Sequence, residues 1–101
     1  MDLEQIQGQV KKGQWRITTH AAVEATKDGV SPKDVKQIIL TGKIIESYPD
    51  RERHLIYGML SDMSNLPVHV VVDYSNDDQI VAVTAYVPDD KEWIASQKRK
   101  R

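Results

Sequence analysis

The stretch SPKDVKQIILTGKIIESY, residues 31–48, contains the change of pattern that decides the fold. Ser31 is a favoured N-cap residue, and Pro32 stands at the first helical position, where its missing N–H costs nothing. Apolar residues then recur at helical spacing until Gly42, a typical helix stop. Immediately after this glycine the apolar period changes from helical to two. We therefore predict a helix that begins at Pro32 and is followed directly by a strand over residues 43–48.

Two helices and a short extended segment are predicted upstream of this stretch. Apolar side chains at helical spacing predict a helix over residues 3–12. Residues 14–18 alternate between polar and apolar, which is typical of a short strand or extended segment. Thr19 is the predicted N-cap of the second helix, which reaches Asp28 and stops at Gly29, a residue that accepts a positive φ.

Three more strands are predicted downstream of the opening stretch, over residues 53–61, 67–74 and 79–86. The connections between the strands are short, which favours an antiparallel meander. The predicted fold class is α+β, with the N-terminal helices packed on one face of a four-stranded antiparallel sheet. The other face stays partly open, and we expect it to carry the function.

Length and charge limit the organisation of the chain. Its 101 residues and 11.5 kDa suffice for a single domain, which we place at residues 1–97. The last four residues, 98–101, are all basic and form a tail that is either solvated and frayed, as we expect, or contacts phosphate. Because the whole chain has a net charge of −1, the part that precedes this tail carries −5. A uniformly basic nucleic-acid-binding protein does not have this distribution.

Composition also excludes several classes of protein and site. The chain has no cysteine, so it forms no disulfide, no thiolate zinc site and no cysteine nucleophile. Its apolar runs are far shorter than the ~20 residues of a membrane span, and the acidic N-terminus does not resemble a signal peptide. We expect a cytoplasmic protein with no membrane segment. No motif for nucleotide, ester or dinucleotide chemistry is present, and no cofactor is expected.

Three histidines, His20, His54 and His69, are candidate acid–base residues. Their spacing matches no helical or strand metal motif, so no metal site is expected. His69 interrupts a valine-rich strand on the face opposite to the apolar residues. It either lines a cleft or is a semi-buried histidine with a hydrogen-bond partner. His20, in the first turn of a helix, acts as a neutral donor or acceptor in one interpretation and fixes the strand-to-helix corner in the other.

Arg53 and Tyr86 complete the candidate set. Arg53 belongs to the charged run 51–54, which is either a solvated turn or the source of a phosphate ligand beside an acid–base group. Tyr86 ends the last predicted strand, where it either packs, stacks on a base or donates its hydroxyl. Trp93 is predicted to anchor the C-terminal segment in the core.

Five segments carry a resemblance to a known family, in an order that runs from about residue 15 to the end. They are ITTHA at 17–21, GVSPKDV at 29–35, GKIIESYP at 42–49, LPVHVV at 66–71 and VTAYVPD at 83–89, followed by Trp93 and the basic ending. In these segments the chain resembles the small prokaryotic family called domain of unknown function 4258. That family is similar to the RelE-like (barnase/EndoU/colicin/RelE) toxin superfold, in which helices pack on an antiparallel sheet. By this resemblance, three residues match positions of the family's sequence pattern, namely His20, His69 and Tyr86.

Two functional hypotheses follow. The resemblance implies a RelE-like toxin-type domain, a metal-independent endoribonuclease that acts on RNA or at the ribosome. We then assign His69 and His20 to acid–base catalysis, Arg53 to the phosphate, and Tyr86 to base stacking or proton donation. The alternative is a non-catalytic module on the same fold that binds an antitoxin-like protein or a second copy of itself. A nuclease requires these four side chains to converge on one phosphate, whereas an interaction module requires only an apolar patch.

Overall fold

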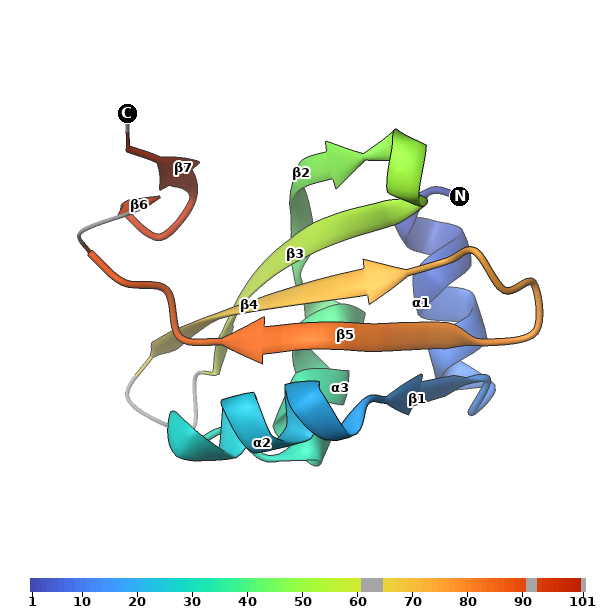
Figure 1. The fold of residues 1–101 in the computed structure, drawn as a ribbon, viewed down its shortest axis with the longest axis horizontal. Coiled ribbons are helices and arrows are strands. Elements are labelled where there is room, and N and C mark those ends of the chain that lie inside the picture. Colours follow the sequence, from blue (N-terminus) through green and yellow to red (C-terminus); the bar gives the residue numbers. More distant parts are fainter. Residues whose placement is uncertain (61–64, 91–92, 101) are drawn as a thin grey trace.

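The computed structural model describes residues 1–60, 65–90 and 93–100, and Figure 1 shows their arrangement. The helices are α1 (Leu3–Lys11), α2 (Thr19–Lys27) and α3 (Pro32–Thr41). The main strands are β1 (Trp15–Ile17), β2 (Lys43–Tyr48), β3 (Arg53–Leu60), β4 (Leu66–Asp73) and β5 (Ile80–Tyr86). The short 3-10 helix η1 (Pro49–Arg51) joins β2 to β3, and β6 (Trp93–Ile94) and β7 (Lys98–Arg99) follow at the C-terminus. The fold is α+β, as the sequence predicts.

Side-chain caps explain why two of the helices begin where they do. Ser31 and Asp34 each accept the other's backbone N–H, so a capping box precedes α3 and confirms the predicted Ser31 cap. The prediction that Thr19 caps α2 is wrong by one residue, because the cap is Thr18. Thr18 keeps an extended backbone because its own N–H donates to the carbonyl of Ala82 in β5.

The five main strands form one sheet in the order β1-β5-β4-β3-β2. The strands β2 to β5 pair antiparallel with their neighbours in the chain, as predicted. The prediction of a purely antiparallel, four-stranded sheet is nevertheless wrong, because β1 adds a fifth strand that runs parallel to β5. In this pair Trp15 lies opposite Ile80, and Ile17 lies opposite Ala82. β1 has only three residues, so its place in the sheet depends on contacts distant in sequence.

The main core lies between one face of the sheet and the helices α1 and α3, which stand behind the sheet in Figure 1. Its buried side chains include Ile6, Val10, Val35, Ile38, Ile39, Ile56, Val68, Val70, Val72 and Ile80. Burial of each such side chain contributes about 1.5–3 kcal/mol. Because side chains alternate along β4, the core valines leave His69, Val71 and Asp73 on the opposite face, which we call the open face.

α2 follows β1 and lies alongside β5 (Figure 1). The Glu24 carboxylate accepts the Ala85 N–H, and the Asp28 carboxylate accepts the Val87 N–H, both at 2.9 Å. Backbone pairing with β1 reaches only as far as Ala82 on β5. The two carboxylates of α2 therefore bind N–H groups of this edge beyond the point where β1 ends.

The C-terminal strands β6 and β7 form a separate two-stranded hairpin, with Trp93 opposite Arg99. Its turn holds Ala95 and Ser96 in the left-handed region, at φ 51° and 63°. Trp93 is only 2% exposed, which agrees with its predicted role as an anchor. Lys98 and Arg99 are exposed but paired, so the expectation of a frayed basic end does not describe them. None of the helices in the described part of the chain is long and apolar enough to cross a membrane.

Candidate functional site

A row of residues crosses the open face from one edge of the sheet to the other. Tyr48 pairs with Arg53, Arg53 with Asp73, Asp73 with Val81, and Val81 with Arg16. We call these five residues the arginine row. Neighbouring strands lie about 4.8 Å apart, so the backbones of Arg16 and Arg53 are separated by about 14 Å. The row thus places two cationic side chains on the same surface with one carboxylate between them.

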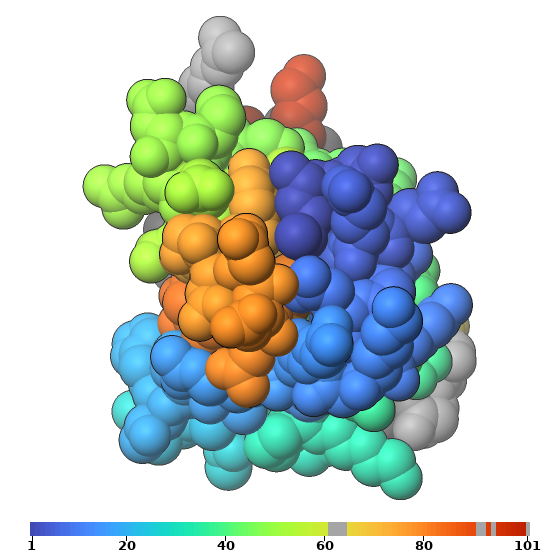
Figure 2. Space-filling view, turned by 90° about the vertical axis from the view of Figure 1, so that its right-hand side faces the viewer, coloured from blue at the N-terminus to red at the C-terminus, as the bar shows by residue number. Residues whose placement is uncertain are grey.

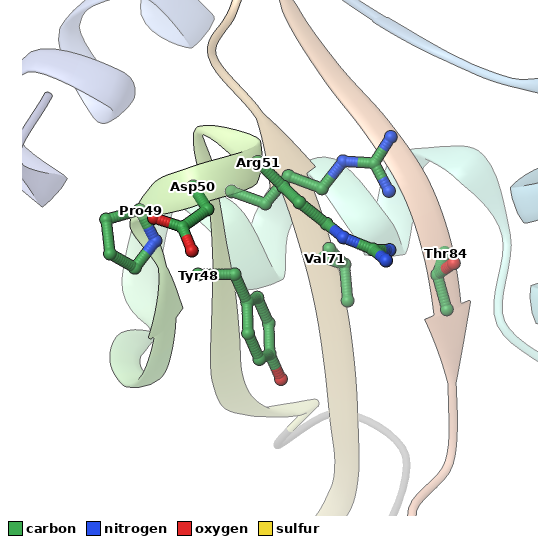
Figure 3. A pocket seen from close by; sticks show the side chains of 7 residues that line it. Tyr48, Pro49, Asp50, Arg51, Val71 and Thr84 are labelled. Atoms are coloured by element: carbon green, nitrogen blue, oxygen red, sulfur yellow. The ribbon is translucent and has the colours of Figure 1, made fainter.

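A pocket with a volume of about 540 Å³ lies at the β2 end of this row. Its walls include Tyr48, Asp50, Arg51, Arg53, Val71 and Thr84. In Figure 3 the Arg51 side chain extends over Val71 towards Thr84, whereas Asp50 lies on the side of Pro49. We call this the arginine pocket. Arg51 has no ion pair with any other residue in the described ranges, so its charge is available to an anionic ligand.

A second pocket, of about 360 Å³, continues from the first along the arginine row. Both pockets are lined by Arg53, and the second adds Arg16, Thr18, Asp73, Ser75 and Asn76. We call it the side pocket. Figure 2 shows this end of the molecule, where the loop between β4 and β5 lies between the η1 segment and the N-terminal part of the chain. The two pockets share Arg53 and are therefore adjacent.

Arg53 is held in place by Asp73. Its Nε donates to the Asp73 Oδ2 at 2.8 Å, across the β3–β4 pair. The other carboxylate oxygen accepts the Ser75 backbone N–H at 2.9 Å and also the Ser75 hydroxyl. Burial raises the pKa of Asp73, but the bonds from Ser75 and Arg53 outweigh it and hold that pKa below its ordinary value. The carboxylate is therefore ionised at neutral pH, and it orients the guanidinium that lines both pockets.

His69 lies at the opposite end of the open face and is fully buried. Its Nε2 lies within hydrogen-bond distance of the Ser96 carbonyl, and its Nδ1 is 3.2 Å from the Tyr86 hydroxyl. A carbonyl can only accept, so Nε2 carries the proton and Nδ1 accepts from Tyr86. Burial lowers the pKa of His69, although the Ser96 carbonyl partly opposes this, and burial raises the pKa of Tyr86 to about 12. Both groups are neutral at physiological pH.

The C-terminal hairpin covers this end of the open face. The Trp93 ring packs edge-on against His69, with their centroids 4.4 Å apart. The Arg99 guanidinium lies 4.4 Å from the Trp93 ring centroid and 3.1 Å from a carboxylate oxygen of Glu46. Glu46 also accepts the Tyr48 hydroxyl. We call the part of the open face beneath the hairpin, around His69 and Tyr86, the covered end.

The structure brings two of the four predicted catalytic residues together and separates the others. His69 and Tyr86 are in contact at the covered end. Arg53 pairs with Asp73, four residues along the strands from His69, which corresponds to about 13 Å. His20 lies on α2, with a side chain that is 71% exposed and its Nε2 3.8 Å from Glu24. The predicted convergence on one phosphate is absent from these positions, and their catalytic roles stay predictions.

The remaining candidate, His54, has a different environment. Its Nδ1 is 2.8 Å from the Ser47 hydroxyl, and its Nε2 donates to the Met1 carbonyl at 2.7 Å. The ring also stacks on Tyr74, with a centroid separation of 4.8 Å. This histidine ties the N-terminus to the sheet. Among the described residues, no three histidine or carboxylate side chains are grouped as a metal site would require.

Arg53 is the one residue of the two pockets that the sequence marks as a site candidate, and most of the residues around it were not predicted. Tyr48, Asp50 and Arg51 belong to the turn after β2, where polar residues are read as solvated. Arg16 stands between two apolar residues of a short strand, and the parallel pairing of β1 alone brings it to the row. One feature of the sequence could have indicated the arginine pocket: two arginines, at positions 51 and 53, lie in and directly after the tight turn that joins β2 to β3.

Comparison with known proteins gives a single family assignment. A family model described as "Domain of unknown function (DUF4258)" matches residues 17–87. This range begins at the last residue of β1 and contains β2 to β5, the arginine pocket and the buried pair His69–Tyr86. Arg16 of the side pocket precedes it, and the C-terminal hairpin follows it. No curated protein matches, and no solved structure matches.

Proposed function

We propose, for a chain that belongs to the DUF4258 family of unknown function, that it is a RelE-like domain that binds RNA and cleaves it without a metal. The site is the arginine pocket on the open face of the sheet. The RelE-like assignment rests on the sequence resemblance and on the α+β arrangement of helices against a sheet. Fold alone does not determine function, and the support for this function comes from the chemistry of the pocket.

The observation that carries the proposal is the pair of arginines on one pocket. Arg53 is oriented by Asp73 through its Nε, and Arg51 approaches the same pocket from η1 without an ion-pair partner among the described residues. Planar guanidinium groups bind phosphate with several hydrogen bonds in a fixed geometry. An anionic phosphodiester is therefore the ligand class that this pocket fits best.

The other polar residues of the pocket suit cleavage of that phosphodiester. Asp50 supplies a carboxylate that can take the proton of the ribose 2′-hydroxyl. Burial and a hydrogen bond to Glu46 raise the pKa of Tyr48, so its phenol is protonated at neutral pH. When the hydroxyl turns from Glu46 to the leaving 5′-oxygen, it can donate this proton. The 2′-oxygen then bonds to phosphorus while the 5′-oxygen departs, which leaves a 2′,3′-cyclic phosphate and a 5′-hydroxyl. Arg51 and Arg53 stabilise the charge that develops on the phosphate.

A cleavage assay in EDTA tests the proposal. End-labelled RNA is incubated with the purified protein, free and as part of ribosomes, and the products are analysed for 2′,3′-cyclic phosphate ends. We expect Asp50→Asn, Tyr48→Phe and Arg53→Gln each to lower the rate by about a hundredfold. Lys33→Ala, on α3, removes a positive charge outside the pocket and serves as the matched control. If the wild-type protein cleaves neither form of RNA, the endoribonuclease is excluded.

A second candidate function is a non-catalytic interaction module, and one observation favours it. Both ring nitrogens of His69 are engaged in hydrogen bonds and the ring is fully buried, while His20 stands apart on α2. A shallow apolar hollow on α2, lined by Ala22 and the half-exposed Val23, offers a contact for a protein partner or a second copy. A gel-shift measurement with the same labelled RNA separates the two candidates, because binding without cleavage supports a binding role for the arginine pocket and excludes the nuclease.

A further inference from the structure

We propose that the side pocket holds a second backbone phosphate, so that single-stranded RNA runs along the arginine row, across the direction of the strands. This inference rests on the proposed function, because the first phosphate occupies the arginine pocket. It adds Arg16 as a phosphate ligand, and it specifies a single strand of more than one nucleotide as the substrate.

The two pockets are adjacent along the arginine row. Arg53 lines both, and the register places it on one row with Arg16, three strands away. Arg16 and Arg53 both line the side pocket, so a phosphate held there can contact either guanidinium. Arg51 lines only the arginine pocket. Two phosphates, one in each pocket, therefore provide a partner for all three arginines, whereas one phosphate leaves either Arg16 or Arg51 without one.

The groups around Arg16 suit an anion. Its side chain is exposed, and within the described ranges it has no ion pair. The pocket also exposes Thr18, Ser75 and Asn76, residue types that donate neutral hydrogen bonds to phosphate oxygens. The one carboxylate that lines it, Asp73, is already engaged by Arg53 and Ser75.

The hairpin excludes the alternative path along the strands. At the covered end, His69 and Leu55 are at most 1% exposed, and Trp93 and Arg99 lie over this part of the sheet. A bound strand therefore meets the hairpin if it follows β3 or β4 from the arginine pocket. The arginine row, which runs across the strands, remains accessible. At its β2 end the ring of Tyr48 offers a surface on which a base can stack.

Binding of 2′-O-methyl octauridylate tests this path, because the methylated strand lacks the attacking hydroxyl and is not cleaved. Its affinity is measured by fluorescence anisotropy at several salt concentrations, and uridine 3′-monophosphate serves as a probe for a single phosphate. We expect Arg16→Ala to weaken binding of the octamer about fivefold and to reduce the slope of log affinity against log salt by about 0.7. The affinity for the monophosphate should not change, because it occupies the arginine pocket alone.

The variants separate failure of this inference from failure of the proposed function. Arg51→Ala should weaken binding of both the octamer and the monophosphate, whereas the control Lys33→Ala should affect neither. If Arg51→Ala lowers affinity but Arg16→Ala changes neither affinity nor salt slope, the second phosphate site is wrong and the first stands. If Arg51→Ala and Arg53→Ala both bind like the wild type, the proposed function itself is overturned. An RNA duplex that binds as tightly as the single strand overturns the assignment of a single-stranded substrate.

Discussion

His69 of β4 donates its Nε2 proton to the main-chain carbonyl of Ser96, at the turn of the C-terminal hairpin. The bond joins the middle of the sheet to a segment that lies beyond the region matched by the family model. We expect His69→Gln to lower the free energy of unfolding by about 1–3 kcal/mol, because glutamine cannot satisfy both Ser96 and Tyr86 with the geometry of an imidazole. Urea denaturation measures this loss. An unchanged midpoint would show that the hairpin does not depend on the histidine.

The same histidine should make stability depend on pH. Burial lowers the pKa of His69 in the folded protein below its ordinary value of 6.5, so the unfolded chain binds the proton more tightly. This contribution to stability is present above pH 6.5 and is lost as the pH falls towards the folded pKa. Losses from Glu46 and Asp73 begin only at lower pH, near their ordinary values of 4.5 and 3.8. The decline that starts near pH 6.5 should disappear in His69→Gln and persist in the exposed-site control His20→Gln.

Arg99 fixes the outer strand of the hairpin through two contacts. It pairs with Glu46 at 3.1 Å and lies over the Trp93 ring. We expect Arg99→Gln to destabilise the protein by about 1 kcal/mol, since a half-exposed ion pair and an exposed cation–π contact each contribute less than that. Arg99→Lys keeps the charge but not the planar guanidinium group. The stability of this variant should therefore lie between that of the wild type and that of Arg99→Gln. Unfolding followed by tryptophan fluorescence measures both variants, and equal stability of all three proteins would show that the two contacts of Arg99 contribute nothing to the fold.

The coupling between Arg53 and Asp73 can be measured with a double-mutant cycle. Arg53→Gln, Asp73→Asn and the double variant should give an interaction energy of no more than about 1 kcal/mol, because the Arg53 side chain is one-third exposed. The coupling should decrease at 1 M salt, where exposed charges are screened. A coupling of zero at low salt would mean that Asp73 does not position the guanidinium.

The cap of α3 provides a test that does not depend on the candidate site. Ser31→Ala removes one half of the capping box and should destabilise the protein by about 1 kcal/mol. Pro32→Ala should cost less, because proline only presets φ at a position whose N–H is free in any case. Ser31→Asp keeps an acceptor and is the matched control. Equal and negligible shifts of the urea midpoint for all three would contradict the cap.

The fold could be predicted from sequence where neighbouring residues determine it, as at helix caps and in strands with alternating polarity. Ser31 and Gly42 bound α3 by capping chemistry, and the alternation of β4 put the valines on one face and His69 on the other. The place of β1 could not be predicted, because three residues give almost no periodicity and their partner lies more than sixty positions later. The hairpin was missed for a related reason, since its turn uses Ala95 and Ser96 at positive φ instead of glycine or asparagine.

The candidate site was predictable only in part. Arg53 stood out as a charged residue at the start of a strand, and its role as a phosphate ligand stays a prediction. Arg16 and Tyr48 join it only through the sheet register, which pairs strands from both ends of the chain. His69 could be recognised as unusual, but its burial depends on the hairpin, so the choice between a cleft and a structural role required the tertiary structure.

The carboxylates of Glu24 and Asp28 give α2 a second role, as a guard against misassembly. A strand edge with free N–H groups is a template on which another chain can add. Beyond the end of β1, the Ala85 and Val87 N–H groups are occupied by side chains of α2, and a foreign strand must displace this helix before it can pair there. α2 has nine residues and buries Ala21 and Ala25, so this edge of β5 is exposed only when the helix leaves the sheet in a local opening. The rate at which this protein aggregates through β5 should therefore follow the local opening of one short helix, and a variant of normal global stability with a weakened α2 should aggregate first.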